Sequence, residues 1–319
     1  MFSFDPKKNT SSEKVSDQFI DGVHLELTSL IQLRQIALQL AARAPRTAVK
    51  THAGAELSRA LGRGLDFAEV REYKAGDDIR MIDWKVTARS GTAHTKLFHE
   101  DHEKPTYFFV DYRQCMHFGT QKALKSVLAA NMAALLAWSA QRAGNRVGGV
   151  VFDGQKPLET KPAGGQKGVL QFLHSLVNGH RATDQNAASM SLSRVLQRLS
   201  HLVHTGSTVV FLSDFLGFDH ETQTCLNRLR QHNRCIAVHI YDLLESRLPP
   251  PGRYAMGQGQ QMTILNSADS KQRAKHHQRF QQHQNKMRKY FSGSGNYFVE
   301  LCTEDDWLEI ARQLMRHVG

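Results

Sequence analysis

Charged side chains crowd the segment from residue 62 to residue 104, and the carboxylates among them have the chemistry of general acids and bases. Acidic and basic residues alternate along this segment, which favours ion pairs and hydrogen bonds that hold an irregular loop. No nucleophile or second general base stands at a diagnostic spacing from these carboxylates. The sequence therefore predicts that the protein is not an enzyme. The alternating charges are Glu69, Arg71, Glu72, Asp77, Asp78, Arg80, Asp83 and Arg89.

Two shorter motifs contain residue types found at metal and phosphate sites. The run His99-Glu100-Asp101-His102 lacks the H-E-x-x-H spacing, and on a predicted strand, Thr95–His99, its two histidines would point to opposite faces. The run from Gly164 to Gly168 could cradle a phosphate at a helix start, but it lacks the spacing of a phosphate-binding loop. We therefore predict that the run from His99 to His102 does not bind a metal and that the run from Gly164 to Gly168 forms a flexible turn.

Polar residues also follow apolar runs at positions where a sheet would end. Asp111 follows one apolar run, Ser213 and Asp214 follow another, and Thr183 precedes a predicted helix. A single aspartate in such a place is explained by helix capping. Two of them on strands that could be neighbours make capping a weaker explanation, because ligands of α/β sheets lie beyond the carboxyl ends of the strands.

The elements that must position these residues begin after Pro105, where short apolar runs alternate with longer helical stretches. The runs are continuously apolar, and each precedes a helix. They therefore predict a doubly wound α/β domain with a mostly parallel sheet, covered on both faces. The predicted strands are Tyr107–Val110, Val147–Phe152, Thr208–Leu212, Cys235–Tyr241 and Asn296–Leu301, and the predicted helices are Lys122–Arg142, Lys167–Val177, Ser191–Val203, Thr222–Gln231, Ser270–Tyr290 and Glu304–Val318.

The part before this domain has a different pattern. Apolar residues recur at three and four from Phe19 to Arg43, which predicts an amphipathic helix ended by Pro45. Farther on, Asp77 and Asp78 are expected to cap a short helix that stops at Gly91. The predicted organisation is a disordered N-terminus at 1–18, an N-terminal helix with a small irregular/β accessory module at 19–104, and the α/β domain at 105–319.

The composition of the chain indicates where in the cell the protein is found and which kinds of partner it binds. The four cysteines are far apart, no signal peptide is seen, and the most apolar stretch, Val127 to Ala140, is shorter than the roughly 20 residues of a membrane span. The sequence therefore predicts a soluble cytoplasmic protein with no membrane span. The net charge of +11 favours an acidic partner, nucleic acid or an anionic surface.

Most of the positive excess lies in one late segment. Between Arg253 and Tyr290 there are eight lysines or arginines and one acid, Asp269. The predicted helix at 270–290 is either a solvated basic face or a contact for an acidic partner or nucleic acid. Few aromatics accompany the charges, which makes nucleic acid the weaker alternative.

One stretch closely resembles a family signature: residues 62–104, GRGLDFAEVREYKAGDDIRMIDWKVTARSGTAHTKLFHEDHEK. It resembles that of the bacterial domain-of-unknown-function family fifty-eight, and the likeness continues through the Leu212–Phe215 and Asp242–Glu245 motifs to cover roughly residues 50–318. The resemblance implies a von Willebrand factor A-like domain that acts as an adaptor or co-chaperone beside a MoxR-type AAA+ ATPase. The matching signature residues are Asp66, Phe67, Arg71, Tyr73, Gly76, Asp77, Asp78, Arg80, Ile82, Asp83, Trp84, Ala88 and Arg89.

The resemblance also implies a metal-ion-dependent adhesion site, in which an Asp-x-Ser-x-Ser loop, a threonine and a second aspartate hold Mg²⁺. Asp111, Thr183 and Asp214 match the retained positions, but Arg113 and Cys115 stand where the two serines would be. A guanidinium repels a cation and a thiol is a soft ligand, so we expect a degenerate site without metal or other cofactor. Arg113 could fill the position of the ion by pairing with an aspartate, or it could turn into solvent.

These observations together predict a non-enzymatic protein-interaction module. Its expected partner is a MoxR-type AAA+ ATPase, together with client proteins. The alternatives are a hydrolase of unknown substrate and a nucleic-acid-binding protein that uses the basic helix at 270–290.

Overall fold

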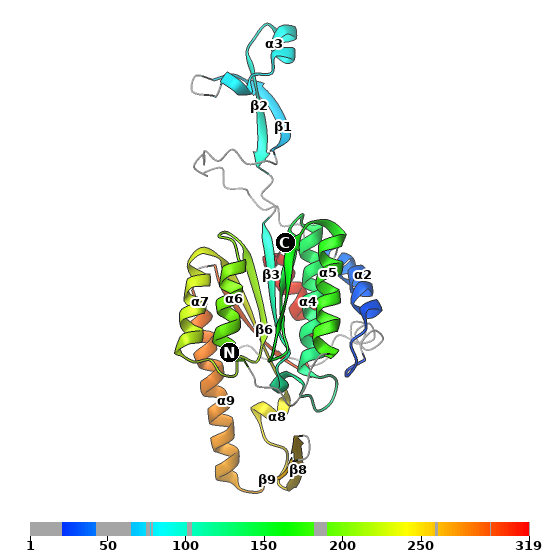
Figure 1. Ribbon diagram of the computed structural model, residues 1–319, viewed down its shortest axis with the longest axis vertical. Coiled ribbons are helices and arrows are strands. Elements are labelled where there is room, and N and C mark those ends of the chain that lie inside the picture. Colours follow the sequence, from blue (N-terminus) through cyan, green and yellow to red (C-terminus); the bar gives the residue numbers. More distant parts are fainter. Residues whose placement is uncertain are drawn as a thin grey trace, which may run out of the picture. The chain divides into compact units, whose positions relative to one another are not determined.

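The computed structural model in Figure 1 describes residues 21–42, 65–74, 77, 79–100, 104–181, 190–258, 261–293 and 295–318. The predicted disorder at 1–18 therefore lies outside the described residues. The chain divides into two compact units, a small one at 45–103 and a large one made of 1–44 and 104–319. The second part of the large unit begins at Lys104.

A six-stranded sheet forms the centre of the large unit, in the order β10-β7-β6-β3-β4-β5. All neighbouring strands are parallel except β5, which runs antiparallel to β4 at the edge. The mixed α/β class and the mostly parallel sheet are thus confirmed. The strands are β3 (Pro105–Asp111), β4 (Arg146–Phe152), β5 (Pro157–Ala163), β6 (Thr208–Ser213), β7 (Arg234–Tyr241) and β10 (Tyr297–Cys302).

The edge strand β5 was not predicted from the sequence. It contains Pro157 and Pro162, and its residues alternate between partly buried and exposed instead of forming an apolar run. Proline cannot donate to a ladder, so it is tolerated at an edge and not in a central strand. The strands that were predicted, such as β3 and β6, are buried along nearly their whole length.

Helices cover both faces of the sheet, as Figure 1 shows. The central helix, α4, is buried from Lys125 to Ala140, which explains why its sequence is nearly all apolar. None of the helices among the described residues has the length and apolarity that crossing a bilayer requires. One face carries α2 (Leu27–Ala42), α4 (Lys125–Arg142), α5 (Gly165–Arg181) and α10 (Trp307–Val318), and the other carries α6 (Leu192–Leu202), α7 (His220–His232) and α9 (Ser270–Phe291).

The N-terminal helix α2 packs with the large unit. Leu30 and Leu33 are buried in the same core as α4, and the indole Nε1 of Trp138 donates to the carbonyl of Leu30 at 3.0 Å. The sequence analysis grouped this helix with the signature module. The structure differs because the apolar stripe of α2 is buried against α4.

Between β7 and α9 the chain forms an extension of the large unit, here called the arm. It consists of the short helix α8 (Leu243–Ser246), a hairpin of β8 (Arg253–Gln258) and β9 (Gln261–Asn266), and the first half of α9 (Figure 1). The hairpin was not predicted, because its glycine- and glutamine-rich sequence has no regular alternation of apolar and polar residues.

The small unit pairs β1 (Leu65–Glu72) with β2 (His94–Glu100) in antiparallel fashion, with the helix α3 (Trp84–Ser90) between them. Asp83 caps α3 by accepting from the backbone N–H groups of Lys85 and Val86. The predicted cap at Asp77 was wrong: its carboxylate accepts from the N–H of Lys74, and a separate 3₁₀ turn at 79–81 precedes α3. Asp78 lies outside the described residues. The predicted stop at Gly91 is confirmed by its left-handed φ of 76°.

Candidate functional site

The candidate site lies where the direction of the chain through the sheet reverses. β3 and β6 are neighbours, and from them the chain proceeds to β4 on one side and to β7 on the other. Asp111 ends β3 and Asp214 directly follows β6, so both carboxylates come to this switch point. Both are buried, and the hydroxyl of Ser213 donates to Oδ2 of Asp111 at 2.6 Å. Phe215 follows with φ 54°, a conformation that is strained for a bulky residue.

Arg113 lies between the two carboxylates. Its Nε and Nη2 donate to Oδ1 and Oδ2 of Asp111 at 3.0 and 2.7 Å, and Nη2 is 3.7 Å from Oδ1 of Asp214. A further hydrogen bond, from Nη1 to the carbonyl of Leu216 at 2.9 Å, holds the loop after β6. Burial lowers the pKa of Arg113, but the charge and hydrogen bonds of Asp111 outweigh burial and raise it. The side chain is only 13% exposed, so this geometry is the paired one of the two alternatives.

Lys125 supplies a second buried cation. Its Nζ donates to Oδ2 of Asp214 at 3.0 Å and to Oε1 of Glu245 at 2.7 Å, and the side chain is fully buried. Burial lowers the pKa of Lys125, but the charges of Asp214 and Glu245 overcome this effect and raise it. Burial in turn raises the pKa of Asp214, whereas the Lys125 charge lowers it, with a net lowering. The result is a charge network, defined as Asp111, Arg113, Asp214, Lys125 and Glu245.

Asp242 holds in place the helix α8, which carries Glu245 of the charge network. Its buried carboxylate accepts from the hydroxyls of Thr120 and Thr303, both at 2.8 Å, and from the backbone N–H of Leu244. Glu245 accepts in return from the N–H of Asp242, which completes a capping box. The short helix α8 is therefore anchored, and Glu245 is held toward Lys125.

Two histidines connect the site with α9. The ring Nε2 of His283 lies 3.0 Å from the carbonyl oxygen of Asp214. His239 of β7 is buried beside it, with the ring centroids 5.5 Å apart. Burial lowers the pKa of His239 to about 3, so this imidazole is neutral near pH 7.

Cys115 and Thr183 are the remaining residues of the predicted adhesion site. Cys115 is partly buried beside Asp214, and burial raises the pKa of its thiol, so a reactive thiolate is not formed near pH 7. Thr183 lies outside the described residues. Sequence analysis placed Asp111, Arg113, Cys115 and Asp214 in one site, and the structure brings these four together.

Sequence analysis assigned no role to Lys125, and it did not separate Glu245 from the matching motif. The available signal for Lys125 was its place two residues before the most apolar stretch of the chain, at the start of the predicted helix. For Glu245 the signal was the spacing Asp-x-x-Glu, which is typical of a capping box.

The residues of this site do not fit a divalent cation. Mg²⁺ prefers oxygen ligands in an octahedron, whereas the oxygens of Asp111 already face the Arg113 guanidinium and those of Asp214 face both cations. A cation there would lie within a few ångströms of two positive charges. Among the described residues, no group of three or more His, Cys, Asp or Glu side chains is placed to hold a metal ion.

The signature residues belong to the small unit. Nη2 of Arg71 pairs with Oδ1 of Asp77 at 2.8 Å, and hydrogen bonds from Lys74 and Arg71 lower the pKa of Asp77. Trp84 is 67% exposed and Ile79 is 64% exposed. Asp66 and Phe67 lie on β1, Tyr73 follows it, Arg80 is in the 3₁₀ turn, and Arg89 is near the end of α3, while Gly76 and Asp78 lie outside the described residues.

These features define a mixed α/β protein with a closed charge network at the switch point of a mostly parallel sheet. The chain belongs to the family described as "Protein of unknown function DUF58", whose model matches residues 69–288. The relatives "Uncharacterized protein Rv1480" of Mycobacterium tuberculosis and "Uncharacterized protein Mb1516" of Mycobacterium bovis are each 26% identical over 258 residues, which is 80% of this chain and 80% of the relative.

Two solved structures match part of this chain. The conserved hypothetical protein BatB from Bacteroides thetaiotaomicron has a TM-score of 0.42 and 8% identity, with 67% of this chain and 98% of that chain covered. An aerotolerance-related membrane protein from Bacteroides fragilis has a TM-score of 0.39 and 8% identity, with the same coverage.

Proposed function

We propose that this protein is a non-enzymatic protein-interaction module, built on a von Willebrand factor A-like domain, that partners a MoxR-type AAA+ ATPase. The charge network carries the proposal. At the switch point, where ligands of open α/β sheets bind, Arg113 and Lys125 already neutralise both buried carboxylates. Such a site supports recognition without metal and offers no charged group ready to activate a substrate.

The named fold and partner rest on the family resemblance of the sequence. The position of Asp111 and Asp214 at adjacent strand ends supports the von Willebrand factor A-like assignment. The ATPase and its client proteins are the partners that the family resemblance implies. The cytoplasmic location stays a prediction from the sequence.

A hydrolytic function is the weaker candidate. Two Ser–His side-chain contacts occur among the described residues: Oγ of Ser90 with Nδ1 of His94 at 3.0 Å, and Oγ of Ser126 with Nε2 of His180 at 3.2 Å. Nδ1 of His94 also faces the carbonyl oxygen of Thr92 at 2.7 Å, so it carries the proton there and does not act as a base toward Ser90. Ser126 is fully buried, so a substrate does not reach its hydroxyl in this conformation. The raised pKa of the Cys115 thiol likewise speaks against a cysteine nucleophile.

We assign partner docking to the small unit. Trp84 and Ile79 are each two-thirds exposed, and such exposure is unusual for apolar side chains of this size. Tryptophan is also the residue type that most often dominates a binding interface, since it buries a large area with little loss of side-chain entropy.

The test is affinity capture by the tagged full chain from native cells. An AAA+ ATPase is expected to co-purify, and Trp84→Ala should weaken that capture about tenfold or more. Leu38→Ala, on the exposed face of α2 at 49% exposure, is the matched control and should capture as well as the unmodified chain. Absence of any AAA+ ATPase would overturn the proposed partner, and undiminished capture by Trp84→Ala would overturn the docking assignment.

A further inference from the structure

Helix α9 has five exposed cations on one side. At 3.6 residues per turn they fall within about a quarter of the helix circumference and extend over about 27 Å. No acidic residue lies within the helix. We call this set the basic stripe, and it consists of Lys271, Lys275, Arg279, Lys286 and Lys289.

The opposite side of α9 is occupied by contacts within the fold. Met287 and Phe291 are buried in the core between the sheet and α7. Toward the start of the helix, Nη1 of Arg273 donates to the carbonyl of Ser267, and Nδ1 of His277 lies 2.9 Å from the carbonyl of Ser246. These contacts fix the rotation of α9, so Lys271, Lys275, Arg279 and Lys289 of the basic stripe face solvent, while the ammonium of Lys286 donates to the carbonyl of Phe218 at 2.9 Å.

The stripe destabilises the helix that carries it. Lys271, Lys275 and Arg279 are spaced four residues apart, and like charges at this spacing repel. Cations in the first turns also oppose the helix dipole, and the carboxylate of Asp269 at the N-cap is the single acid at that end to offset them. The side chains of these three residues make no hydrogen bond or ion pair with any described residue. An anionic partner along the stripe would relieve both effects.

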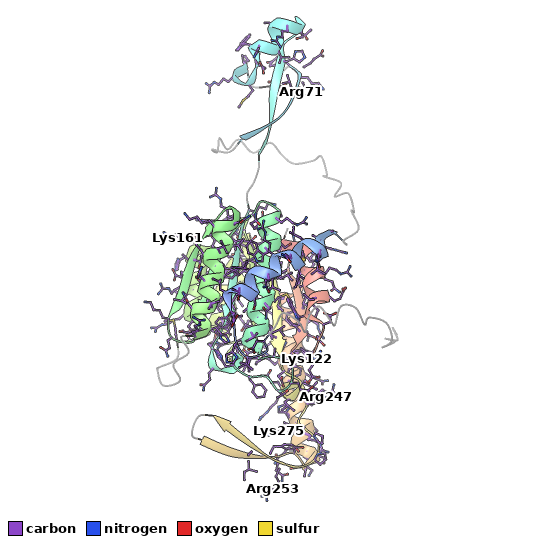
Figure 2. The ribbon with its side chains drawn as sticks, turned by 90° about the vertical axis from the view of Figure 1, so that its right-hand side faces the viewer. Arg71, Lys122, Lys161, Arg247, Arg253 and Lys275 are labelled. Atoms are coloured by element: carbon purple, nitrogen blue, oxygen red, sulfur yellow. The ribbon has the colours of Figure 1, made fainter. Side chains whose placement is uncertain are left out.

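The rest of the arm also carries a positive net charge. From Arg247 to Tyr290, nine lysines and arginines stand against one carboxylate, that of Asp269, which caps α9. In the view of Figure 2, Lys122, Arg247, Lys275 and Arg253 follow one another from the end of the sheet body to the hairpin. The arm therefore presents a positive field well beyond the stripe itself.

We propose that the basic stripe of α9 docks an acidic segment of a protein partner. This inference rests on the proposed binding function and adds the chemistry of the partner. Charge complementarity of this kind accelerates association and fixes register, more than it adds affinity. Lys271, Lys275 and Arg279 rise by about 6 Å from one to the next along α9, which matches carboxylates at the same four-residue spacing on a partner helix.

Nucleic acid is a poorer match because the aromatic rings near the stripe are engaged. The hydroxyl of Tyr254 donates to the carbonyl of Pro250, that of Tyr290 to the carbonyl of Gln223, and Phe280 packs against Tyr241. Of these rings only Tyr254 is exposed, at 36%, so the stripe offers little of the base stacking that supplies much of single-strand affinity. A lipid surface fits less well, because the apolar side of α9 is inside the fold.

A labelled alanine-based peptide of about 20 residues, with glutamates at every fourth position, is the probe. Fluorescence anisotropy at about 0.05 and 0.15 M salt should show binding by the full chain that weakens as salt rises. Combining Lys271→Gln, Lys275→Gln and Arg279→Gln should weaken it about tenfold or more. The control combines Arg142→Gln, Lys161→Gln and Lys167→Gln, which are exposed positions elsewhere and remove the same charge. It should stay within about twofold of the unmodified chain.

Equal losses in the two triple variants would mean that only net charge matters, and would overturn the inference. So would unchanged binding in the α9 variant, once circular dichroism shows both variants folded. Tighter, stripe-dependent binding to a duplex DNA or to phosphatidylserine vesicles would assign the stripe to that ligand instead. Peptide binding through the stripe without capture of an ATPase would leave this inference standing while the proposed partner fails.

Discussion

The Nζ atom of Lys125 lies 3.0 Å from Oδ2 of Asp214, and both side chains are almost completely buried. The contact joins the first turn of α4 to the end of β6, 89 residues apart in sequence. The same Nζ holds Glu245 of α8 at 2.7 Å, so one ammonium group ties three elements together. A charge removed from water is stable only when paired, so this cation and its carboxylates depend on one another.

Replacing Lys125 by methionine should therefore destabilise the protein strongly. The change leaves Asp214 buried without this partner, which costs about 3–5 kcal/mol of unfolding free energy. Urea unfolding measures it. Arg198→Met is the control, because Arg198 pairs with Glu159 while 57% exposed, and its loss should cost at most about 1 kcal/mol. Adding Asp214→Asn to Lys125→Met should recover part of the loss, and a fully additive double variant would contradict the coupling.

The charge network marks the limit of what the sequence could reveal. Asp111 and Asp214 could be predicted as neighbours, because parallel strands bring their carboxyl ends to one edge. Lys125 and Glu245 could not, because their contact spans 120 residues and depends on how α4 and α8 pack. Local patterns specify which elements form, but the pairing of buried charges is decided by tertiary structure.

The same contrast holds for the fold. The central strands were predictable from continuous apolar runs such as that of β6. The hairpin of the arm was not, since its sequence has no regular alternation of apolar and polar residues and is interrupted by the Gly- and Gln-rich run at 257–261. The cap of α3 was misplaced for a different reason: Asp77, Asp78 and Asp83 are all competent caps, and only the backbone geometry selects Asp83.

Acidification should weaken the fold through His239. Its pKa is lowered to about 3 by burial, with His283 and Lys125 adding to the lowering and Asp214 opposing it. Below the usual value near 6.5, the unfolded chain binds a proton on this imidazole and the folded chain does not. The free energy of unfolding therefore falls as the pH falls, by about 2 kcal/mol from this group between pH 7 and pH 5.

The His239→Phe variant isolates that contribution. Phenylalanine keeps the stacking against Tyr241 and Phe298 but cannot be protonated. Urea unfolding at pH 7 and pH 5 should show the unmodified chain losing about 2 kcal/mol more than the variant. His201→Phe, at an exposed position on α6, should reproduce the pH dependence of the unmodified chain. Identical pH dependence in His239→Phe would rule out the assignment.

In the small unit, Asp83→Ala should unravel the start of α3. The carboxylate accepts from the N–H groups of Lys85 and Val86 at 3.0 and 3.2 Å, and losing an N-cap costs about 1 kcal/mol. Hydrogen exchange of the α3 amides should quicken by a factor of about five. Asp83→Ser retains a cap oxygen and should restore most of the protection. If serine and alanine behave alike, Asp83 acts through another contact.

The last expectation is that the protein does not require Mg²⁺. Two unit charges about 4 Å apart interact by roughly 4 kcal/mol at an effective dielectric of 20, and a divalent ion beside Arg113 would be repelled about twice as strongly. Calorimetry with Mg²⁺ and Mn²⁺ on the purified chain should detect no binding, and EDTA should leave the melting temperature unchanged. A Kd below about a millimolar that Asp111→Ala abolishes would refute this.

A double variant, Arg113→Ser with Cys115→Ser, tests whether these two side chains are the reason that the site does not bind Mg²⁺. It replaces the guanidinium and the thiol by two hydroxyl oxygens and leaves Asp111 and the Oδ1 atom of Asp214 facing the vacated position. We expect it to bind Mg²⁺ and, without the ion, to be less stable than the unmodified chain, because the buried Asp111 has lost its bidentate partner. Arg198→Ser is the control, and it should gain no metal binding. If the double variant binds Mg²⁺ but its metal-free form is as stable as the unmodified chain, the Arg113–Asp111 pair contributes nothing to the stability of the fold. If it does not bind Mg²⁺ at all, Lys125 alone excludes the ion from the switch point.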